Sequence, residues 1–221
     1  LREIANSKTA IYDGMMPAFV DAKIGQISDD VLLSICPYLE ADPRIWDWMA
    51  EPDRTRIRRL LETTDVESLK AHAAFDAFAI APLSAVLFER FNGFDLTTQI
   101  SVVSEHPRRE LVQPAIDLYS GARSYRDAEM LGQSVILPTA PFFEHADVEA
   151  LLCAVRENNQ IWYAGGTPDV LEQVFDLTKP ILGQTREYWQ AFVDGQIKRM
   201  EGDASAYYAY PGLQQKLAEN P

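Results

Sequence analysis

Cysteine is scarce in this chain, with only Cys36 and Cys153 among 221 residues. Secreted domains that depend on disulfides carry many more cysteines, so this count excludes a disulfide scaffold and favours a reducing compartment. We therefore expect a cytoplasmic protein. Both thiols are expected on the inner faces of helices, where a small apolar side chain fits.

Long hydrophobic runs are also missing. The longest apolar region, residues 71–88, is interrupted by His72, Asp76, Pro82 and Ser84. A membrane-spanning helix needs about 20 predominantly apolar residues without such breaks. The region therefore predicts two buried helices around Pro82 and no membrane span.

Positive charge is in short supply. The chain has 20 Lys and Arg against 33 Asp and Glu, a formal net charge of −13. This excess of negative charge repels phosphate, so nucleic acid and anionic membranes are disfavoured as main partners. The composition is otherwise that of a globular protein, with 47% hydrophobic residues.

Motifs for catalysis, cofactors and metals are lacking as well. His72, His106 and His145 are the only histidines, and no His-x-x-x-His or Cys-x-x-Cys spacing occurs. No nucleophile elbow, Walker motif or dinucleotide fingerprint is found either. We therefore expect no metal and no cofactor, and no motif places a catalytic residue.

Helical periodicity is what the sequence does contain, and strict apolar–polar alternation is rare. Helix starts are marked by Asp42 and Thr167, each followed by proline, and by Thr64 with Glu67 at the capping-box spacing. Further helices are predicted over residues 96–104, 108–119, 125–137, 148–157 and 186–199. The sequence therefore predicts an all-α fold.

Two segments of the chain are weakly similar to each other. Residues 30–62 align with residues 147–178 when one loop is shortened by one residue. The alignment pairs Cys36 with Cys153 and Trp46 with Trp162, and these are rare residue types. The offset of 116–117 residues is close to three periods of about 39 residues, near the repeat length of HEAT units.

In this spacing and punctuation the chain resembles a HEAT-like α-solenoid, at the level of architecture. The resemblance implies stacked antiparallel helix pairs, each of which buries its apolar face only against its neighbours. We expect one helical repeat domain over residues 1–201. Residues 202–221 are expected to form a C-terminal tail with a short capping helix.

A run of arginines stands out against the acidic background. Arg54 and Arg58 are four residues apart, so they share one face of the predicted helix. The run is either a solvated face paired with neighbours such as Glu51 and Glu62, or a docking patch for an acidic partner. The candidate partner-binding residues here are Arg54, Arg56, Arg58 and Arg59.

Three tyrosines near the C-terminus form the second candidate contact. Tyr207, Tyr208 and Tyr210 either dock back on the body of the protein or contact a second chain. The preceding helix, residues 186–199, has an apolar stripe that fits terminal packing and also fits an interface between copies. A homo-oligomer formed through the C-terminal helix therefore stays open.

Three classes of function remain. A solenoid without convergent polar groups is typical of a non-catalytic scaffold or regulatory module that binds another protein, as a domain of a larger protein or by itself. The alternative is an all-α enzyme or small-molecule binder with its site in residues 66–91, where His72, Asp76 and Glu89 lie in apolar helices. The third is a nucleic-acid-handling repeat protein that uses the arginines.

Overall fold

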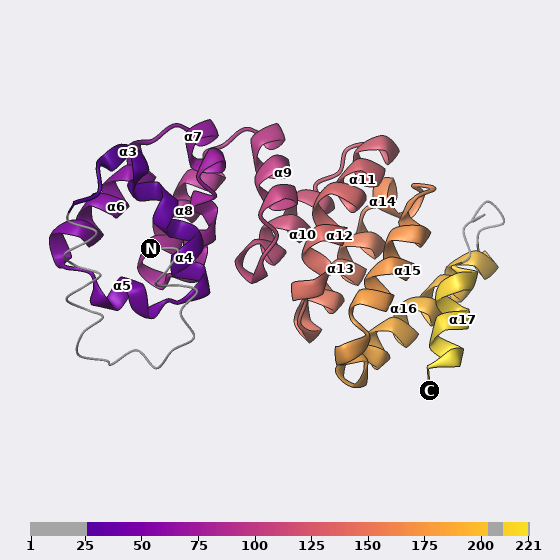
Figure 1. Cartoon of the computed structure of the whole chain (residues 1–221). Coiled ribbons are helices and arrows are strands. Elements are labelled where there is room, and N and C mark those ends of the chain that lie inside the picture. The colour runs from indigo at the N-terminus through magenta and orange to yellow at the C-terminus, as the bar shows by residue number, and fades with distance from the viewer. Residues whose placement is uncertain (1–25, 203–209, 221) are drawn as a thin grey trace. The chain divides into compact units, whose positions relative to one another are not determined.

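The expected all-α fold is confirmed by the structure, a computed structural model that describes residues 26–202 and 210–220, without the side chains of 30, 31 and 199–202. Within these ranges the regular elements are helices, and no strand occurs. The chain divides into two units, Leu1–Val102 and Val103–Pro221 (Figure 1). None of the described helices is both long enough and apolar enough to cross a membrane.

The first unit holds eight described elements and most of a ninth. They are α3 (Asp29–Leu32), η1 (Leu33–Ile35), α4 (Cys36–Ala41), α5 (Arg44–Trp48), α6 (Glu51–Thr63), α7 (Val66–Ala71), η2 (Ala74–Ala79), α8 (Ala81–Asn92) and α9 (Leu96–Glu105), whose last turn belongs to the second unit. The short element η2 lies at the centre, because it packs against both α4 and α8.

Aromatic side chains from η2 fill the core of the first unit. Phe75 and Phe78 are buried, and their ring centroids lie 6.1 Å apart. Phe78 also contacts Phe88 of α8 at 4.7 Å, and Phe75 meets the edge of Phe94 at 6.1 Å. The residue before η2, Ala73, has a φ of +49°, a left-handed conformation that L-residues other than glycine adopt at a cost.

The boundary between α6 and α7 differs from the sequence prediction. Thr64 was expected to cap α7, but the side chain that accepts the Ser68 N–H, at 2.9 Å, belongs to Asp65. The carbonyl of Thr64 instead accepts a hydrogen bond from Arg90 at 2.8 Å. Arg90 also donates to the carbonyls of Leu61 and Glu62, so its guanidinium caps the C-terminal end of α6.

The second unit begins within α9 and contains a chain of packed helices. Its elements are η3 (Arg109–Leu111), α10 (Val112–Ser120), α11 (Tyr125–Leu131), η4 (Gly132–Ile136), α12 (Leu137–Thr139), η5 (Ala140–Phe142), α13 (His145–Glu157), α14 (Asn159–Trp162), α15 (Thr167–Leu177), η6 (Lys179–Ile181), α16 (Leu182–Gly202) and α17 (Pro211–Glu219). Helix α10 packs on α13, α13 on α16, and α17 on both α15 and α16.

The C-terminal helix α17 is fastened to its own unit at both ends. Near its start the ring of Tyr210 is buried against Trp162 and Phe192. At its end Arg186 donates to the carbonyls of Leu217, at 3.1 Å, and Asn220. These contacts satisfy carbonyls that the helix itself leaves without a partner.

The two similar segments share an order of elements but not the burial of every matched pair. Each runs from a helical segment (29–41 or α13) through a short helix (α5 or α14) to a second long helix (α6 or α15), and Trp46 and Trp162 are both 4% exposed. Cys36, however, is fully buried, whereas Cys153 is half-buried and its Sγ accepts from Arg156 at 3.2 Å. The internal repeat and the solenoid therefore stay predictions.

Candidate functional site

Helix α6 carries the four candidate arginines, and the structure divides them into two pairs. Arg56 and Arg59 hold the beginning of the described chain, since both bond the carboxylate of Asp29, at 2.9–3.0 Å. Arg56 also donates to Asp53 Oδ1 and to the carbonyl of Ile27, each at 2.8 Å. These hydrogen bonds to Asp29 and Asp53 raise the pKa of Arg56. These contacts give both residues a structural role at the start of the described chain, and their place in partner binding stays a prediction.

The other pair, Arg54 and Arg58, lines a cleft of about 340 Å³ within the first unit. The opposite wall comes from the end of η2 and the start of α8, and the short helix α5 contributes a third side. We call this the arginine cleft. Its lining residues are Pro43, Trp46, Asp47, Arg54, Arg58, Ala79, Ile80, Ala81 and Pro82.

The helix register explains why α6 divides its arginines in this way. Its buried positions are Asp53, Ile57 and Leu61, four residues apart. Arg54 and Arg58 each follow one of these positions and so lie on the same edge of the buried stripe. The side chains of Arg54 and Arg58 are 29% and 35% exposed, which leaves their guanidinium groups partly accessible.

The charges at the arginine cleft come from three lining residues, Asp47, Arg54 and Arg58, and from Glu51, which pairs with both arginines without lining the cleft itself. Glu51 bridges the arginines, with Oε2 3.2 Å from Arg54 Nε and Oε1 3.1 Å from Arg58 Nη1. The guanidinium of Arg58 also lies over the Trp46 ring, 5.5 Å from its centroid. Asp47 is exposed and lines the cleft from α5. The formal charges of the four groups therefore balance.

The three residues expected in a central catalytic or ligand site do not share one environment. His72 Nδ1 lies 2.7 Å from the carbonyl of Ser68 in its own helix. Asp76 is half-buried near the buried thiol of Cys36. Burial, and to a smaller extent the negative charge of Asp76, raise the pKa of this thiol to about 12. Glu89 is exposed. What the segment 66–91 does contribute is the apolar wall of the arginine cleft, residues 79–82.

Two of the candidate tyrosines, Tyr207 and Tyr208, lie outside the described residues. Tyr210 is described, and it is only 1% exposed. Its ring packs 5.5 Å from that of Phe192 and 6.1 Å from that of Trp162. This burial fits docking on the body of the protein, and it leaves no ring surface of Tyr210 for a second chain.

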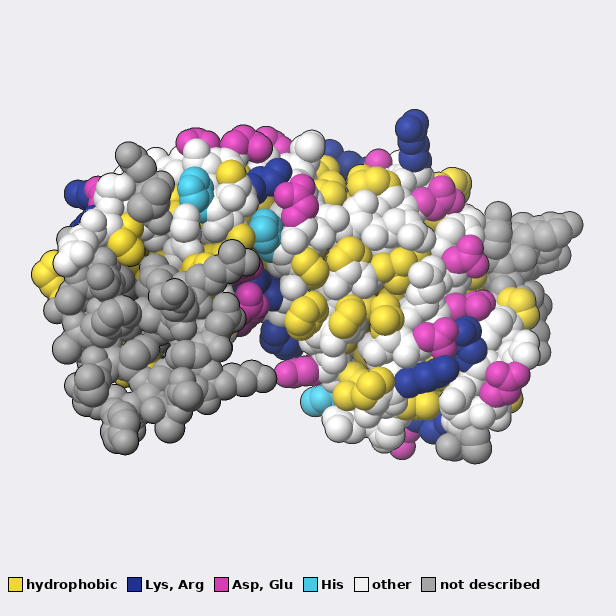
Figure 2. All heavy atoms as spheres, in the orientation of Figure 1, with side chains coloured by type: hydrophobic (Ala, Val, Ile, Leu, Met, Phe, Trp, Pro, Cys, Tyr) yellow, Lys and Arg dark blue, Asp and Glu magenta, His cyan; other side chains and the backbone are white. Residues whose placement is uncertain are grey.

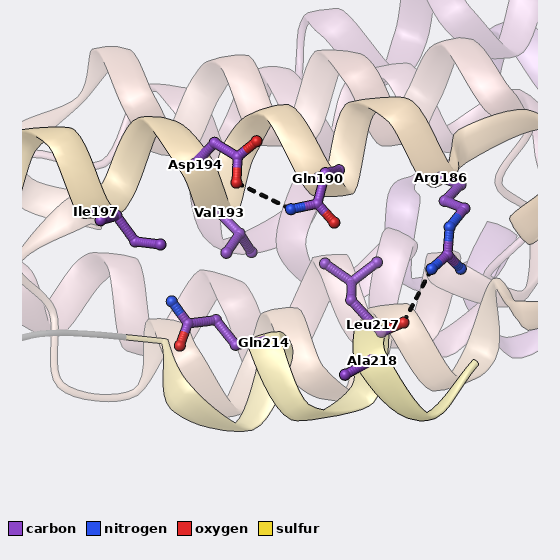
Figure 3. A pocket seen from close by; sticks show the side chains of 8 residues that line it. All are labelled: Arg186, Gln190, Val193, Asp194, Ile197, Gln214, Leu217 and Ala218. Carbon is purple, nitrogen blue, oxygen red and sulfur yellow. Dashed lines mark hydrogen bonds between the residues drawn. The ribbon is translucent and has the colours of Figure 1, made fainter. Parts of the chain in front are cut away.

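A second cleft, also of about 340 Å³, lies between α16 and α17. Figure 3 shows Val193 of α16 and Leu217 of α17 directed into the space between these helices. Two of the polar side chains at its edge are already paired, since Gln190 donates to Asp194 at 2.9 Å and Arg186 to Leu217 O at 3.1 Å. This cleft therefore offers a less distinctive chemistry than the arginine cleft.

The surface of the second unit carries an apolar region. In Figure 2 hydrophobic side chains gather on the face where Figure 1 labels α10, α12 and α13, with charged side chains nearer α15 and α16. No feature of the described residues around this region indicates which molecule it would bind. Among the described residues, no group of three His, Cys, Asp or Glu side chains is placed to hold a metal ion.

Sequence reasoning identified Arg54 and Arg58 but missed the rest of the cleft. The i, i+4 spacing was sufficient to place the two arginines on one face of a helix. Pro43, Asp47 and residues 79–82 carry no local pattern that relates them to α6, because only the tertiary packing of α5, η2 and α8 brings them to it. No protein-family model, curated protein or solved structure matches the chain, so its functional assignment rests on this geometry.

Proposed function

We propose that this chain is a non-catalytic interaction module that binds an acidic segment of another protein in the arginine cleft. One observation carries the proposal: Arg54 and Arg58 both line a cleft that also contains an aromatic ring and an apolar wall. Guanidinium groups bind carboxylates through charge-assisted hydrogen bonds, and apolar side chains beside them add burial. An acidic peptide with a neighbouring apolar residue matches both features.

The broader proposal is a cytoplasmic scaffold whose helices stack in antiparallel pairs as a short HEAT-like solenoid. The scarcity of cysteine supports the compartment. The shared order of helix, short helix and helix in residues 29–63 and 145–177 supports the repeat. A homo-oligomer through the C-terminal helix would use the part of α17 that does not pack on α15 and α16 of its own unit.

The proposal is tested by selecting a displayed library of random short peptides on the purified chain. We expect the selected peptides to be enriched in Asp or Glu next to an apolar or aromatic residue. Their affinity is then measured by fluorescence anisotropy for the wild type and for Arg54→Gln/Arg58→Gln. Loss of two charge-assisted contacts should weaken binding by at least about tenfold.

The matched control is Arg44→Gln on α5 of the same unit. Arg44 is exposed, pairs with Asp42 at 2.8 Å and stacks on Trp48, but it does not line the cleft. Its substitution removes one charge and should leave affinity unchanged. Selected peptides without acidic enrichment, or equal binding by the double variant, would refute the proposal.

The nucleic-acid alternative is tested with the same variants. A labelled single-stranded oligonucleotide is the probe, and its binding is measured across a range of salt concentrations. Binding that falls steeply with salt and depends on Arg54 and Arg58 would favour that alternative, because each phosphate contact releases counterions. We expect no binding that depends on these arginines, since the chain carries a net charge of −13.

A further inference from the structure

We propose that Glu51 occupies, in the free chain, the place of the partner's carboxylate between Arg54 and Arg58, and thereby acts as an internal competitor for the arginine cleft. This inference rests on the proposed function, because it assigns a regulatory residue to the same cleft. It predicts that Glu51 weakens the binding of an acidic peptide in the cleft, and that removing the negative charge of Glu51 increases the affinity for that peptide.

The carboxylate of Glu51 pairs with both arginines at once. Its two carboxylate oxygens are divided between the arginines, with Oε2 3.2 Å from Arg54 Nε and Oε1 3.1 Å from Arg58 Nη1. The Thr55 hydroxyl donates to the same Oε1 at a long 3.4 Å. One carboxylate thus serves two guanidinium groups that both line the cleft. A partner's carboxylate would need the same two groups.

These internal contacts are of the kind that an incoming carboxylate can replace. The Glu51 side chain is 62% exposed, and exposed ion pairs contribute little because water screens them. Arg54 Nε is enclosed and yet forms no aligned hydrogen bond with any described group, although Glu51 Oε2 is near.

Charge balance explains why a partner would replace Glu51 and not add to it. The two arginines pair with Glu51, and Asp47 lines the cleft beside them, so a further carboxylate would give this group of side chains a negative excess. When Glu51 turns out to solvent, the cleft regains one unpaired positive charge. The occupant defined by this arrangement is a peptide with one carboxylate at the arginines and an apolar side chain against Ile80 and Pro82.

The test compares Glu51→Gln with Glu62→Gln, using the acidic peptides selected on the wild type. Both positions are exposed residues of α6 and both substitutions remove one negative charge, but Glu62 forms no ion pair with Arg54 or Arg58 in the structure. We expect Glu51→Gln to bind about two- to fivefold more tightly, as loss of one exposed ion pair implies. Glu62→Gln should stay close to the wild type.

Glu51→Asp provides a second variant that keeps the charge and shortens its reach. It should also bind more tightly, because an aspartate at this position is too short to bridge both arginines. In the Arg54→Gln/Arg58→Gln background, Glu51→Gln should have no effect on affinity. Circular dichroism and the melting temperature establish that each variant is folded.

The outcomes separate this inference from the function on which it rests. If the double arginine variant loses binding but Glu51→Gln does not gain any, competition by Glu51 is refuted and the proposed function stands. If Glu62→Gln gains as much as Glu51→Gln, the effect is one of net charge and the inference also fails. If the double arginine variant binds normally, the proposed function itself is refuted.

Discussion

The buried amide of Gln196 offers the sharpest test of the packing in the second unit. Gln196 lies on α16 and is only 2% exposed. Neither its Nε2 nor its Oε1 has a hydrogen-bond partner among the groups that the structure describes. We predict that Gln196→Met, which keeps the length of the side chain and removes both polar atoms, stabilises the protein.

The magnitude follows from the cost of desolvating polar atoms. A buried donor or acceptor without a partner costs about 1–3 kcal/mol. Methionine removes this cost and has enough freedom to fill the same space. We expect a gain of about 1–3 kcal/mol, and at least about 4 °C in the melting temperature of a unit of this size.

The assay is differential scanning calorimetry, because the chain has two units and only the transition of the second should move. Gln190→Met is the matched control. It lies on the same helix, but its amide is exposed and donates to Asp194 Oδ1 at 2.9 Å. Substitution at such a surface position should change stability by no more than about 0.5 kcal/mol.

A fall in the melting temperature for Gln196→Met would refute the reasoning. That result would mean that the amide has a partner in solution, such as a buried water with several hydrogen bonds. The free energy lost would then measure that partner's contribution.

Three further predictions concern the caps, the backbone and the docking of α17. Arg90→Ala should destabilise the first unit by about 2–4 kcal/mol, because three carbonyls at the end of α6 lose their donor. Calorimetry of the first unit's unfolding transition measures this loss. Arg90→Lys should restore only part of the lost stability. Ala73→Gly should stabilise the same unit by about 0.5–1 kcal/mol, since relief of the left-handed strain exceeds the added freedom of the unfolded chain. Hydrogen bonds from Lys216, and to a smaller extent from Lys179, lower the pKa of Asp176 in the folded protein. The ionised carboxylate therefore stabilises the fold above the unfolded pKa of about 3.9, and this stabilisation is lost as the pH falls through the lower folded value. Near-ultraviolet circular dichroism of the aromatic contacts of Tyr210 should therefore report weaker docking of α17 in acid, and Asp176→Asn should remove this pH dependence.

Local sequence signals were sufficient to predict that helices form, but they did not fix several of the residues at which the helices begin or end. Proline after Thr167 indicated the start of α15 to within one residue, since the helix begins at Thr167 and its N-cap position is Gly166, which has no side-chain cap. The capping box at Thr64 and Glu67 was misplaced by one residue, because Asp65 offers a carboxylate to the same turn. Thr64 and Asp65 both carry side-chain oxygens that can cap a helix, and in the structure Asp65 does so while the carbonyl of Thr64 accepts from Arg90.

The aligned segments show a similar limit. The alignment of residues 30–62 with residues 147–178 also pairs Leu61, which is fully buried, with Leu177, which is 43% exposed. Identity of residue type therefore did not guarantee the same helix face. A single-residue change of register rotates a helix by about 100°, and only the neighbours packed against α6 and α15 determine which face turns inward.

The sequence by itself determined that the chain is helical, because hydrophobic periodicity and helix punctuation act within a few residues of each other. It also determined that Arg54 and Arg58 share a helix face. Only the tertiary structure decided that Arg56 and Arg59 are bound to Asp29, and that the other two arginines meet Trp46 and residues 79–82 in one cleft. Those contacts join residues far apart in the chain, so they depend on the packing of whole helices and not on any local pattern.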